Sequence, residues 1–328
     1  MRRRDFIKAI AGSAAAWPLA AHAQQSALPV VAFVNGGAAE TSARYAATFR
    51  KGVGEAGYVE GQNVTVEYHW LDGHYDQLPA LMTDLTRRHP AVIATPGFTE
   101  GSRAAKAATA TIPIVFGVAT DPVKLGLATS IARPGGNATG INFFLGEVSA
   151  KRLRLLHDVV PNAIRIAVLV NPRNLSTTGP AIVDIQEAAS SIGLQTQIVN
   201  AATIGEIDAV FASFARDHPD ALFIAPDGFF NGRAVQLAIL AARAGIPSTS
   251  SNRDNVAAGA LMSYGTDLAD MFYHVGIYTG KVLKGEKPAE MPVLQSTKFN
   301  FAINLGTARA LGIEVRPDVL SIADEVIE

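Results

Sequence analysis

The sequence predicts an α/β protein made of two doubly wound parallel-sheet lobes. Its 328 residues exceed the ~100–200 residues of a typical domain. Strand-like apolar runs alternate with helix-like segments, and this order requires crossover connections and hence a parallel sheet covered on both faces. The alternation also begins a second time near residue 165. We therefore expect two lobes of similar construction.

The first 23 residues are expected to form an export signal peptide. Residues 1–8 (MRRRDFIK) are basic, residues 9–21 are mostly apolar, and residues 21–23 (AHA) provide a cleavage site for signal removal. The Arg3-Arg4 pair is similar to the twin-arginine variant of such signals. The apolar run contains Pro18 and is shorter than the ~20 residues that span a bilayer. We therefore expect cleavage near Ala23 and a periplasmic mature protein.

The remaining chain is expected to alternate strands and helices. Continuous apolar runs indicate buried parallel strands, and apolar residues spaced three or four apart indicate helices. In the first half, strands are expected at 28–35, 63–70, 91–95 and 113–118, with helices at 40–58, 76–88 and 100–109. In the second half, strands are expected at 165–171, 195–200, 221–225 and 246–249, with helices at 181–192, 204–218 and 232–244.

The two halves also share short sequence matches. Residues 31–35 match 167–171, residues 89–98 match 218–229, and the Ile-Pro pair at 112–113 recurs at 246–247. The matches keep the same order, which favours two copies of one domain. Two such lobes direct the carboxyl ends of their strands at a shared cleft, where ligands bind in this architecture.

Composition and motifs exclude several classes of function. Lys and Arg total 28 and Asp and Glu total 29, so the basic excess of a nucleic-acid-binding protein is missing. Cysteine is absent, which excludes disulfides, thiol nucleophiles and iron–sulfur clusters. Residues 52–57 match G-x-G-x-x-G but close a helix, whereas a dinucleotide site follows a strand and opens a helix. Small residues and a Gly57 cap at a helix end explain them better.

No catalytic or metal-binding motif was found. His69, Asp72, His74 and Asp76 crowd one turn, but they straddle a strand end and a helix start, so metal binding is not expected there. The chain has no G-x-S-x-G, Walker or H-E-x-x-H motif. We therefore expect a protein that binds without catalysing a reaction, with no cofactor, no metal and no nucleic-acid partner.

Two neighbouring segments resemble a known family. Residues 116–127 (FGVATDPVKLGL) and 130–140 (SIARPGGNATG) closely resemble the signature of ABC transporter substrate-binding proteins related to the tryptophan/tyrosine-binding proteins. The resemblance covers residues 28–328. It implies a type I periplasmic-binding fold, whose lobes are joined by three crossovers, and it implies a membrane permease and an ATPase as partners. A small-molecule ligand is implied, without metal or cofactor, and we expect a monomer.

The resemblance also implies where the lobes divide. We expect lobe 1 at 24–144 plus 267–297 and lobe 2 at 145–266 plus 298–328, with crossovers near 142–149, 265–268 and 297–299. The best-known ligands of the family are aromatic amino acids, and those members tend to carry Asp-Asn where this chain has Asp227-Gly228. The ligand itself therefore does not carry over from the resemblance. The candidate residues described next favour a small organic solute, an amino acid or another carboxylate with an apolar or aromatic part.

Residues 174–180 (NLSTTGP) precede the helix expected at 181. Hydroxyl groups there, with Pro180 in the first turn, indicate a helix start whose free N–H groups suit a ligand carboxylate. Plain capping with water is the alternative. Asp227 could pair with a ligand ammonium or could bond only its own backbone.

Other candidates lie at expected strand ends. Aromatic side chains, including Phe230, could stack on a flat ligand or could belong to the core. Asp121, before Pro122, could cap a helix instead of meeting a ligand. The candidate ligand-binding residues are Asn35, Gly97, Phe98, Thr120, Asp121, Asn174, Ser176, Thr177, Asp227, Phe229 and Tyr264.

Two other classes of protein are the alternatives. A secreted two-lobed α/β enzyme would bring titratable groups with perturbed pKa values together in the cleft. The ligand domain of a lac-type transcription regulator shares the fold but would need an N-terminal helix-turn-helix, where this chain has the export signal. Fold alone does not decide among these functions.

Overall fold

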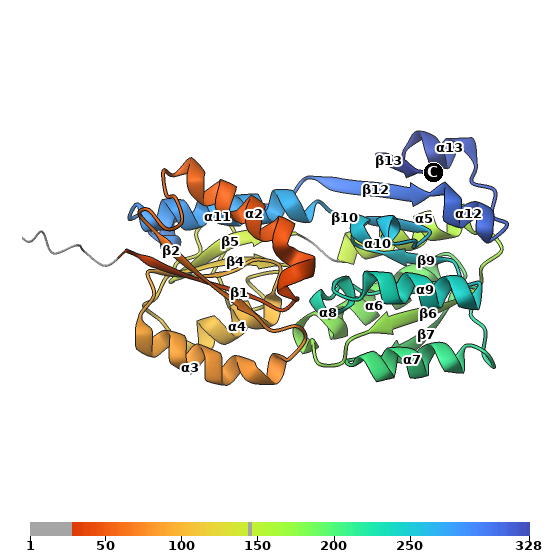
Figure 1. Ribbon diagram of the computed structural model, residues 1–328, viewed down its shortest axis with the longest axis horizontal. Coiled ribbons are helices and arrows are strands. Elements are labelled where there is room, and N and C mark those ends of the chain that lie inside the picture. Colours follow the sequence, from red (N-terminus) through yellow and green to blue (C-terminus); the bar gives the residue numbers. More distant parts are fainter. Residues whose placement is uncertain (1–27, 144–145) are drawn as a thin grey trace, which may run out of the picture.

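The computed structural model describes residues 28–143 and 146–328 and confirms two α/β lobes, each built on its own sheet (Figure 1). The signal peptide expected at 1–23 lies outside the described residues, as does the lobe boundary expected at 144–145. In the part of the chain that is described, no helix combines the length and the apolar character that a membrane crossing needs.

The first lobe is a six-stranded sheet in the order β11-β5-β4-β3-β1-β2, with every neighbouring pair parallel. Its central strands are buried on both faces, as their continuous apolar sequences predict. The elements of its first segment are β1 (Val30–Asn35), α2 (Ala39–Glu55), β2 (Thr65–Trp70), η1 (Tyr75–Gln77), α3 (Leu78–Arg88), β3 (Val92–Thr95), α4 (Thr99–Ala108), β4 (Ile114–Val118) and β5 (Ala138–Asn142).

The second lobe is a seven-stranded sheet in the order β13-β12-β10-β9-β8-β6-β7. Only the β10–β12 pair is antiparallel. Its main segment comprises α5 (Gly146–Val159), β6 (Arg165–Val170), α6 (Leu175–Ser191), β7 (Gln195–Asn200), α7 (Ile204–Ser213), β8 (Ala221–Ile224), α8 (Gly228–Asn231), α9 (Ala234–Ala244), β9 (Ser248–Ser250), α10 (Arg253–Ala257) and β10 (Met262–Thr266).

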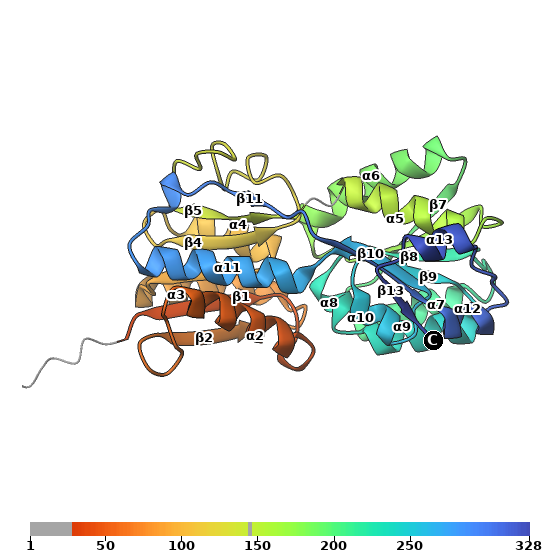
Figure 2. The same cartoon turned by 90° about the horizontal axis from the view of Figure 1, so that it is seen from above.

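The chain passes between the two sheets three times (Figures 1 and 2). It leaves the first sheet after β5, returns after β10 and leaves again after β11. The returning segment contains α11 (Leu268–Leu283), η2 (Pro288–Glu290) and β11 (Leu294–Gln295), and the last segment contains β12 (Phe299–Asn304), α12 (Leu305–Ala310), α13 (Pro317–Ser321) and β13 (Glu325–Ile327).

Several helices differ from the sequence expectation, among them α6, α7 and α8. Helix α6 begins at Leu175 rather than 181, so Pro180 lies inside the helix and not in its first turn. Helix α7 ends at Ser213 rather than 218. The short helix α8, which starts at Gly228, was not expected.

Helices α2 and α11 cross at backbone contact and cover one face of the first sheet. Their apolar residues form a shared core with β1, in which Phe49 of α2 and Phe272 of α11 pack around Phe33. The contact is close because both helices carry glycine at the crossing. A Cβ on Gly52 would lie 2.0 Å from the Tyr273 carbonyl oxygen. The first glycine of the G-x-G-x-x-G sequence is therefore a packing residue, and Gly57 ends the helix with a positive φ of 82°.

The α2–α11 crossing yields a prediction about stability. Gly52→Ala forces the two helices apart, and we expect it to lower the free energy of unfolding by about 1–3 kcal/mol, the cost of overpacking a core. Gly54→Ala is the matched control two residues away, because a Cβ there meets nothing within 4 Å. The control should be neutral or stabilise the helix by up to ~1 kcal/mol. Urea unfolding of both variants measures the difference. Equal stabilities would show that the approach of α2 and α11 does not require glycine at residue 52.

Candidate ligand-binding site between the lobes

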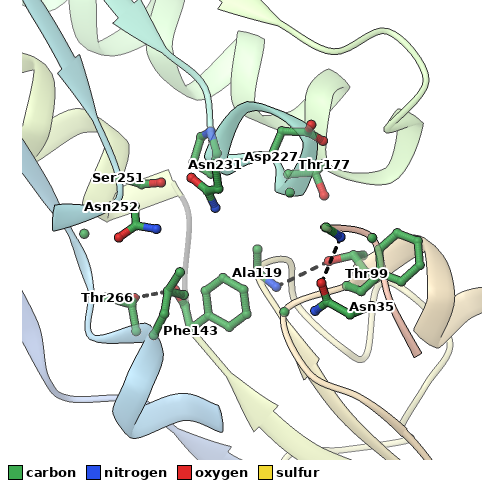
Figure 3. A pocket seen from close by; sticks show the side chains of 18 of the residues that line it. Asn35, Thr99, Ala119, Phe143, Thr177, Asp227, Asn231, Ser251, Asn252 and Thr266 are labelled. Atoms are coloured by element: carbon green, nitrogen blue, oxygen red, sulfur yellow. Dashed lines mark hydrogen bonds between the residues drawn. The ribbon is translucent and has the colours of Figure 1, made fainter. Parts of the chain in front are cut away.

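A cavity lies between the lobes, where strands of both sheets end (Figure 3). The space within it, counted together with the part open to solvent, is about 1060 Å³. The first lobe contributes, among others, Asn35, Phe98, Thr99, Ala119 and Phe143. The second contributes, among others, Arg152, Asn174, Asp227, Asn231 and Asn252. The lining therefore combines aromatic rings with amide and charged groups.

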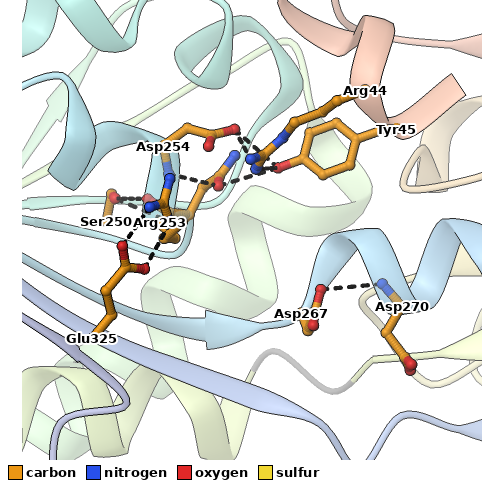
Figure 4. Close-up of polar contacts among 9 residues, drawn as sticks. Arg44, Tyr45, Ser250, Arg253, Asp254, Asp267, Asp270 and Glu325 are labelled. Carbon is orange, nitrogen blue, oxygen red and sulfur yellow. Dashed lines mark hydrogen bonds and ion pairs between the residues drawn. The ribbon is translucent and has the colours of Figure 1, made fainter. Parts of the chain in front are cut away.

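The lobes touch at one side of this cavity through α2 and α10 (Figure 4). The Tyr45 hydroxyl donates to Asn252 Oδ1 at 3.2 Å and to Asp254 Oδ2 at 3.1 Å. Arg44 donates to the Tyr45 oxygen and pairs with Asp254 at 2.5 Å. Burial, aided by the Asp254 carboxylate, raises the pKa of Tyr45 to about 12, so its hydroxyl remains a donor at neutral pH.

A second contact joins α4 to the start of α6, at Ser176. The Ser176 N–H donates to Glu100 Oε1 at 2.6 Å, and Arg103 Nη1 donates to the Ser176 hydroxyl at 2.6 Å. The Ser176 carbonyl would accept from residue 180 in an unbroken helix, but Pro180 has no N–H. Thr120 of the first lobe donates to this carbonyl instead, at 3.4 Å. The N–H, the hydroxyl and the carbonyl of Ser176 are thus all hydrogen-bonded to residues of the first lobe.

Further contacts lie near η1 and α8. The Tyr75 hydroxyl donates to Asp227 Oδ2 at 3.3 Å, and Arg233 pairs with Asp72 at 3.2 Å. Each contact joins a residue of the first sheet's lobe to one of the second. The lobes therefore meet on several sides of the cavity, which is a closed arrangement.

Asp227 is buried, with 6% of its surface exposed, and its carboxylate is the centre of a polar network. Oδ1 accepts from Asn171 at 3.0 Å and from the Phe229 N–H at 2.9 Å, which caps α8. Oδ2 accepts from Asn174 at 2.8 Å and from Tyr75. Burial raises the pKa of Asp227, although these donors oppose the rise. The four hydrogen bonds occupy the usual acceptor positions of a carboxylate.

Arg152 lines the cavity from α5 and was missed by the sequence analysis. Its side chain is 0% exposed, and the guanidinium lies 3.9 Å from the centre of the Phe223 ring. Nη2 donates to the Ile224 carbonyl at 3.3 Å, whereas Nε and Nη1 have no hydrogen-bond partner. Burial lowers the pKa of Arg152 to about 9, so the group stays charged at neutral pH. Among the side chains that the structure describes, no carboxylate lies within 4.0 Å of it.

Two further unpartnered polar groups line the same cavity. Ser149, one turn before Arg152 on α5, is buried and its hydroxyl has no partner. Asn174 donates to Asp227, but its Oδ1 accepts nothing. Buried polar groups usually have partners in native proteins. These groups therefore mark positions where a bound molecule is expected to make hydrogen bonds.

Six of the eleven sequence candidates line the cavity, namely Asn35, Gly97, Phe98, Asn174, Thr177 and Asp227. The other five lie outside its lining. Thr120 and Ser176 join the lobes, and Asp121 accepts from the Val123 N–H at 2.7 Å. Phe229 and Tyr264 pack into the two cores of the second lobe.

One feature of the sequence could have indicated Arg152. Residues 146–159 were not assigned to a helix. In that helix, Arg152 takes a position on the face that buries Val148, Leu155 and Val159. A charged residue at an apolar position is uncommon in the interior and is often functional.

The turn containing His69 and Asp72 does not gather metal ligands. Asp72 pairs with Arg233, and His69 Nε2 lies 3.7 Å from Glu67. Within the described ranges, no three His, Asp or Glu side chains converge in a way that could hold a metal ion.

Comparison with known proteins shows the family. The model of the family described as "ABC transporter substrate binding protein" matches residues 27–327. The tyrosine-binding protein of Clostridioides difficile (strain R20291) is 24% identical over 266 residues, 81% of this chain and 76% of that protein. These matches support the fold and the family that the signature segments predicted.

Solved structures share the two-lobed fold. A Streptococcus pneumoniae ABC domain in complex with L-Trp has a TM-score of 0.82 at 22% identity and covers 92% of this chain and 100% of its own. A ligand-free, open substrate-binding protein from Clostridium difficile has a TM-score of 0.62 at 22% identity, with 92% and 99% covered. The fold is of the periplasmic-binding type I class, and the chain belongs to the ABC transporter substrate-binding protein family.

Proposed function

We propose that this protein binds a small organic solute, an amino acid or another carboxylate with an apolar or aromatic part, in the cavity between its lobes. Its family comprises the substrate-binding proteins of ABC transporters, which act outside the cytoplasm and deliver a small molecule to a permease and an ATPase. The observation that carries the proposal is the cavity itself, enclosed by two lobes that touch around it. Ligand-driven closure of this kind favours the closed state by differential binding.

The chemistry of the lining supports this ligand class. The aromatic rings of Phe98, Phe143 and Phe272 provide apolar surface, and the unpartnered Oδ1 of Asn174 can accept a hydrogen bond. The relatives named above are a tyrosine-binding protein and a structure with L-Trp, both of which bind such molecules.

Individual contacts are part of the proposal. Of the sequence candidates, those proposed to touch the ligand are Asn35, Gly97, Phe98, Asn174 and Thr177, which line the cavity. Asp227 is assigned a positioning role, because it holds the side chain of Asn174 and the hydroxyl of Tyr75.

The organisation of the chain is proposed to follow the same family. The lobe limits are 24–144 plus 267–297 and 145–266 plus 298–328, which agree with the membership of β11 in the first sheet and of β12 in the second. The protein is proposed to act as a monomer, without catalysis, metal, cofactor or nucleic acid. The family contains solute-binding proteins and is not a class of enzymes.

Ligand identity can be tested directly. Mass spectrometry of small molecules released from the protein purified from the periplasm should reveal an organic carboxylate. Added at ~100 times its dissociation constant, the ligand should stabilise the protein by about 2.7 kcal/mol. For a chain of this size this corresponds to a melting shift of about 4–5 °C. A melting shift with sugars and none with carboxylates would show that the ligand class is wrong.

Export can be tested by sequencing the amino terminus. The basic start, the short apolar run and the Ala21-His22-Ala23 site predict removal of the first 23 residues. Edman or mass-spectrometric sequencing of the periplasmic protein should begin at or within a few residues of Gln24. An uncleaved protein retained in the cytoplasm would argue against the assigned location.

Closure can be tested at the α4–α6 contact. Glu100→Ala removes the hydrogen bond that the Ser176 N–H donates to the Glu100 carboxylate, and it leaves the cavity lining intact, so ligand binding should weaken about tenfold. Glu206→Ala is the control, because Glu206 also accepts from a helix-start N–H at 2.6 Å, that of Ala202, within the second lobe. The control should lower stability and leave affinity unchanged. Equal dissociation constants for both variants, measured by calorimetry, would show that the contact between Glu100 and Ser176 does not stabilise the closed state.

A further inference from the structure

We propose that Arg152, assisted by Ser149, binds the carboxylate of the ligand, and that the ligand is an organic acid without an ammonium group. This inference rests on the proposed function and narrows its ligand class. It moves the anion-binding position from the start of α6, where the sequence analysis expected it, to the inner face of α5. It also distinguishes this protein from a binder of zwitterionic amino acids.

Arg152 is available for a ligand because the protein leaves most of its donors unused. Only Nη2 has a partner, the Ile224 carbonyl, at a long 3.3 Å. The Phe223 ring packs against the guanidinium at 3.9 Å, which holds its orientation without using its N–H groups. Nε and Nη1 are free, as is the hydroxyl of Ser149. Both side chains line the cavity.

A purely structural role explains Arg152 poorly. A buried charge is costly unless it is paired and hydrogen-bonded. The side chain is fully buried, yet no described carboxylate lies within ion-pair distance of it. Methionine would fill a similar space beside Phe223 without that cost. The position of the Arg152 charge at the cavity is explained if an anionic group of the ligand pairs with it.

The start of α6 is closed to such an anion. Its Ser176 N–H already donates to the Glu100 carboxylate from the first lobe. A ligand carboxylate placed there would have to displace Glu100 and meet its negative charge. The helix start therefore serves contact between the lobes. Within the described lining, Arg152 is the cation that remains without an anionic partner.

Among the residues of its lining that the structure describes, the cavity has no carboxylate free to hold an ammonium group. Its described lining contains two acidic residues, Asp227 and Asp254. Asp227 already accepts four hydrogen bonds. Asp254 pairs with Arg44 and accepts from Tyr45. An α-ammonium would lose its water without gaining a charged partner, which is unfavourable.

The remaining groups fit a monoanion with a neutral body. The unpartnered Oδ1 of Asn174 suits a hydroxyl or amide donor on the ligand. The aromatic lining suits an apolar or aromatic chain. One unpaired cation matches one negative charge, so a carboxylate fits better than a dianionic phosphate.

The test uses sets of compounds that differ only at the charged groups. The acids are 3-phenylpropionate and 4-methylpentanoate, each compared with its neutral amide and with L-phenylalanine or L-leucine, the matching α-amino acids. The protein is stripped of endogenous ligand by unfolding, dialysis and refolding, and dissociation constants are measured by calorimetry. At least one acid should bind, and its amide and its amino acid should each bind at least about tenfold more weakly.

Substitution on α5 supplies the second half of the test. Arg152→Met should weaken binding of the acid at least about 30-fold, as expected when one partner of a buried charge pair is removed. Arg154→Met, on the exposed side of the same helix, should leave binding unchanged. The ligand-free Arg152→Met protein should melt no lower than the wild type, since it loses an unpaired buried charge. If that variant does not fold, Arg152→Lys and Ser149→Ala take its place, with weaker binding expected for both.

The outcomes separate this inference from the proposed function. Equal binding of an acid to the wild type and to Arg152→Met would overturn the role of Arg152. Tighter binding of an amino acid than of its matching acid would overturn the exclusion of an ammonium group, and binding by none of the acids would overturn the acid class. In each case the proposed transport function stands if another co-purified solute binds, and it fails only if no solute does.

Discussion

The crossing of α2 and α11 is the contact on which the arrangement of the lobes depends. These helices together cover one face of the first sheet, and Gly52 and Gly276 let their backbones meet. Because α11 follows β6 to β10 of the second lobe in the chain, the first lobe is completed only after the chain has passed through most of the second. Three connections result. Two of them are tied together where Thr266 donates to the Phe143 carbonyl at 3.2 Å, beside the cavity.

Much of the fold could be predicted from the sequence because it is encoded locally. Buried parallel strands are continuous apolar runs, and their carboxyl ends place residues such as Asn35 and Asn174 at the cavity. The start of α6 could not be predicted, since Pro180 inside a helix leaves the Ser176 carbonyl unpaired. The group that donates to this carbonyl, Thr120, comes from the other lobe. Local sequence carries no sign of such a partner.

The two buried charges of the cavity differ in how the protein treats them. Asp227 is satisfied by two asparagines, a tyrosine and a backbone N–H, three of these four groups belonging to its own lobe. Arg152, in contrast, packs against the Phe223 ring and donates one hydrogen bond, to the Ile224 carbonyl. Sequence motifs indicated the first residue because aspartate at a strand end is a familiar pattern. Motifs did not indicate Arg152, because its importance depends on the lack of described hydrogen-bond and ion-pair partners around it, which only the packed structure reveals.

If Arg152 binds the anion proposed for it, the closed shape depends on the presence of ligand. When the lobes separate, water reaches the groups that line the cavity, and the charge of Arg152 is hydrated. Closing over an empty cavity removes the water that hydrates this charge and provides no other partner. Closing over an anion replaces the lost hydration with an ion pair. The closed surface is then presented mainly by loaded molecules. A permease that recognises this surface would commit ATP hydrolysis to full carriers and ignore empty ones.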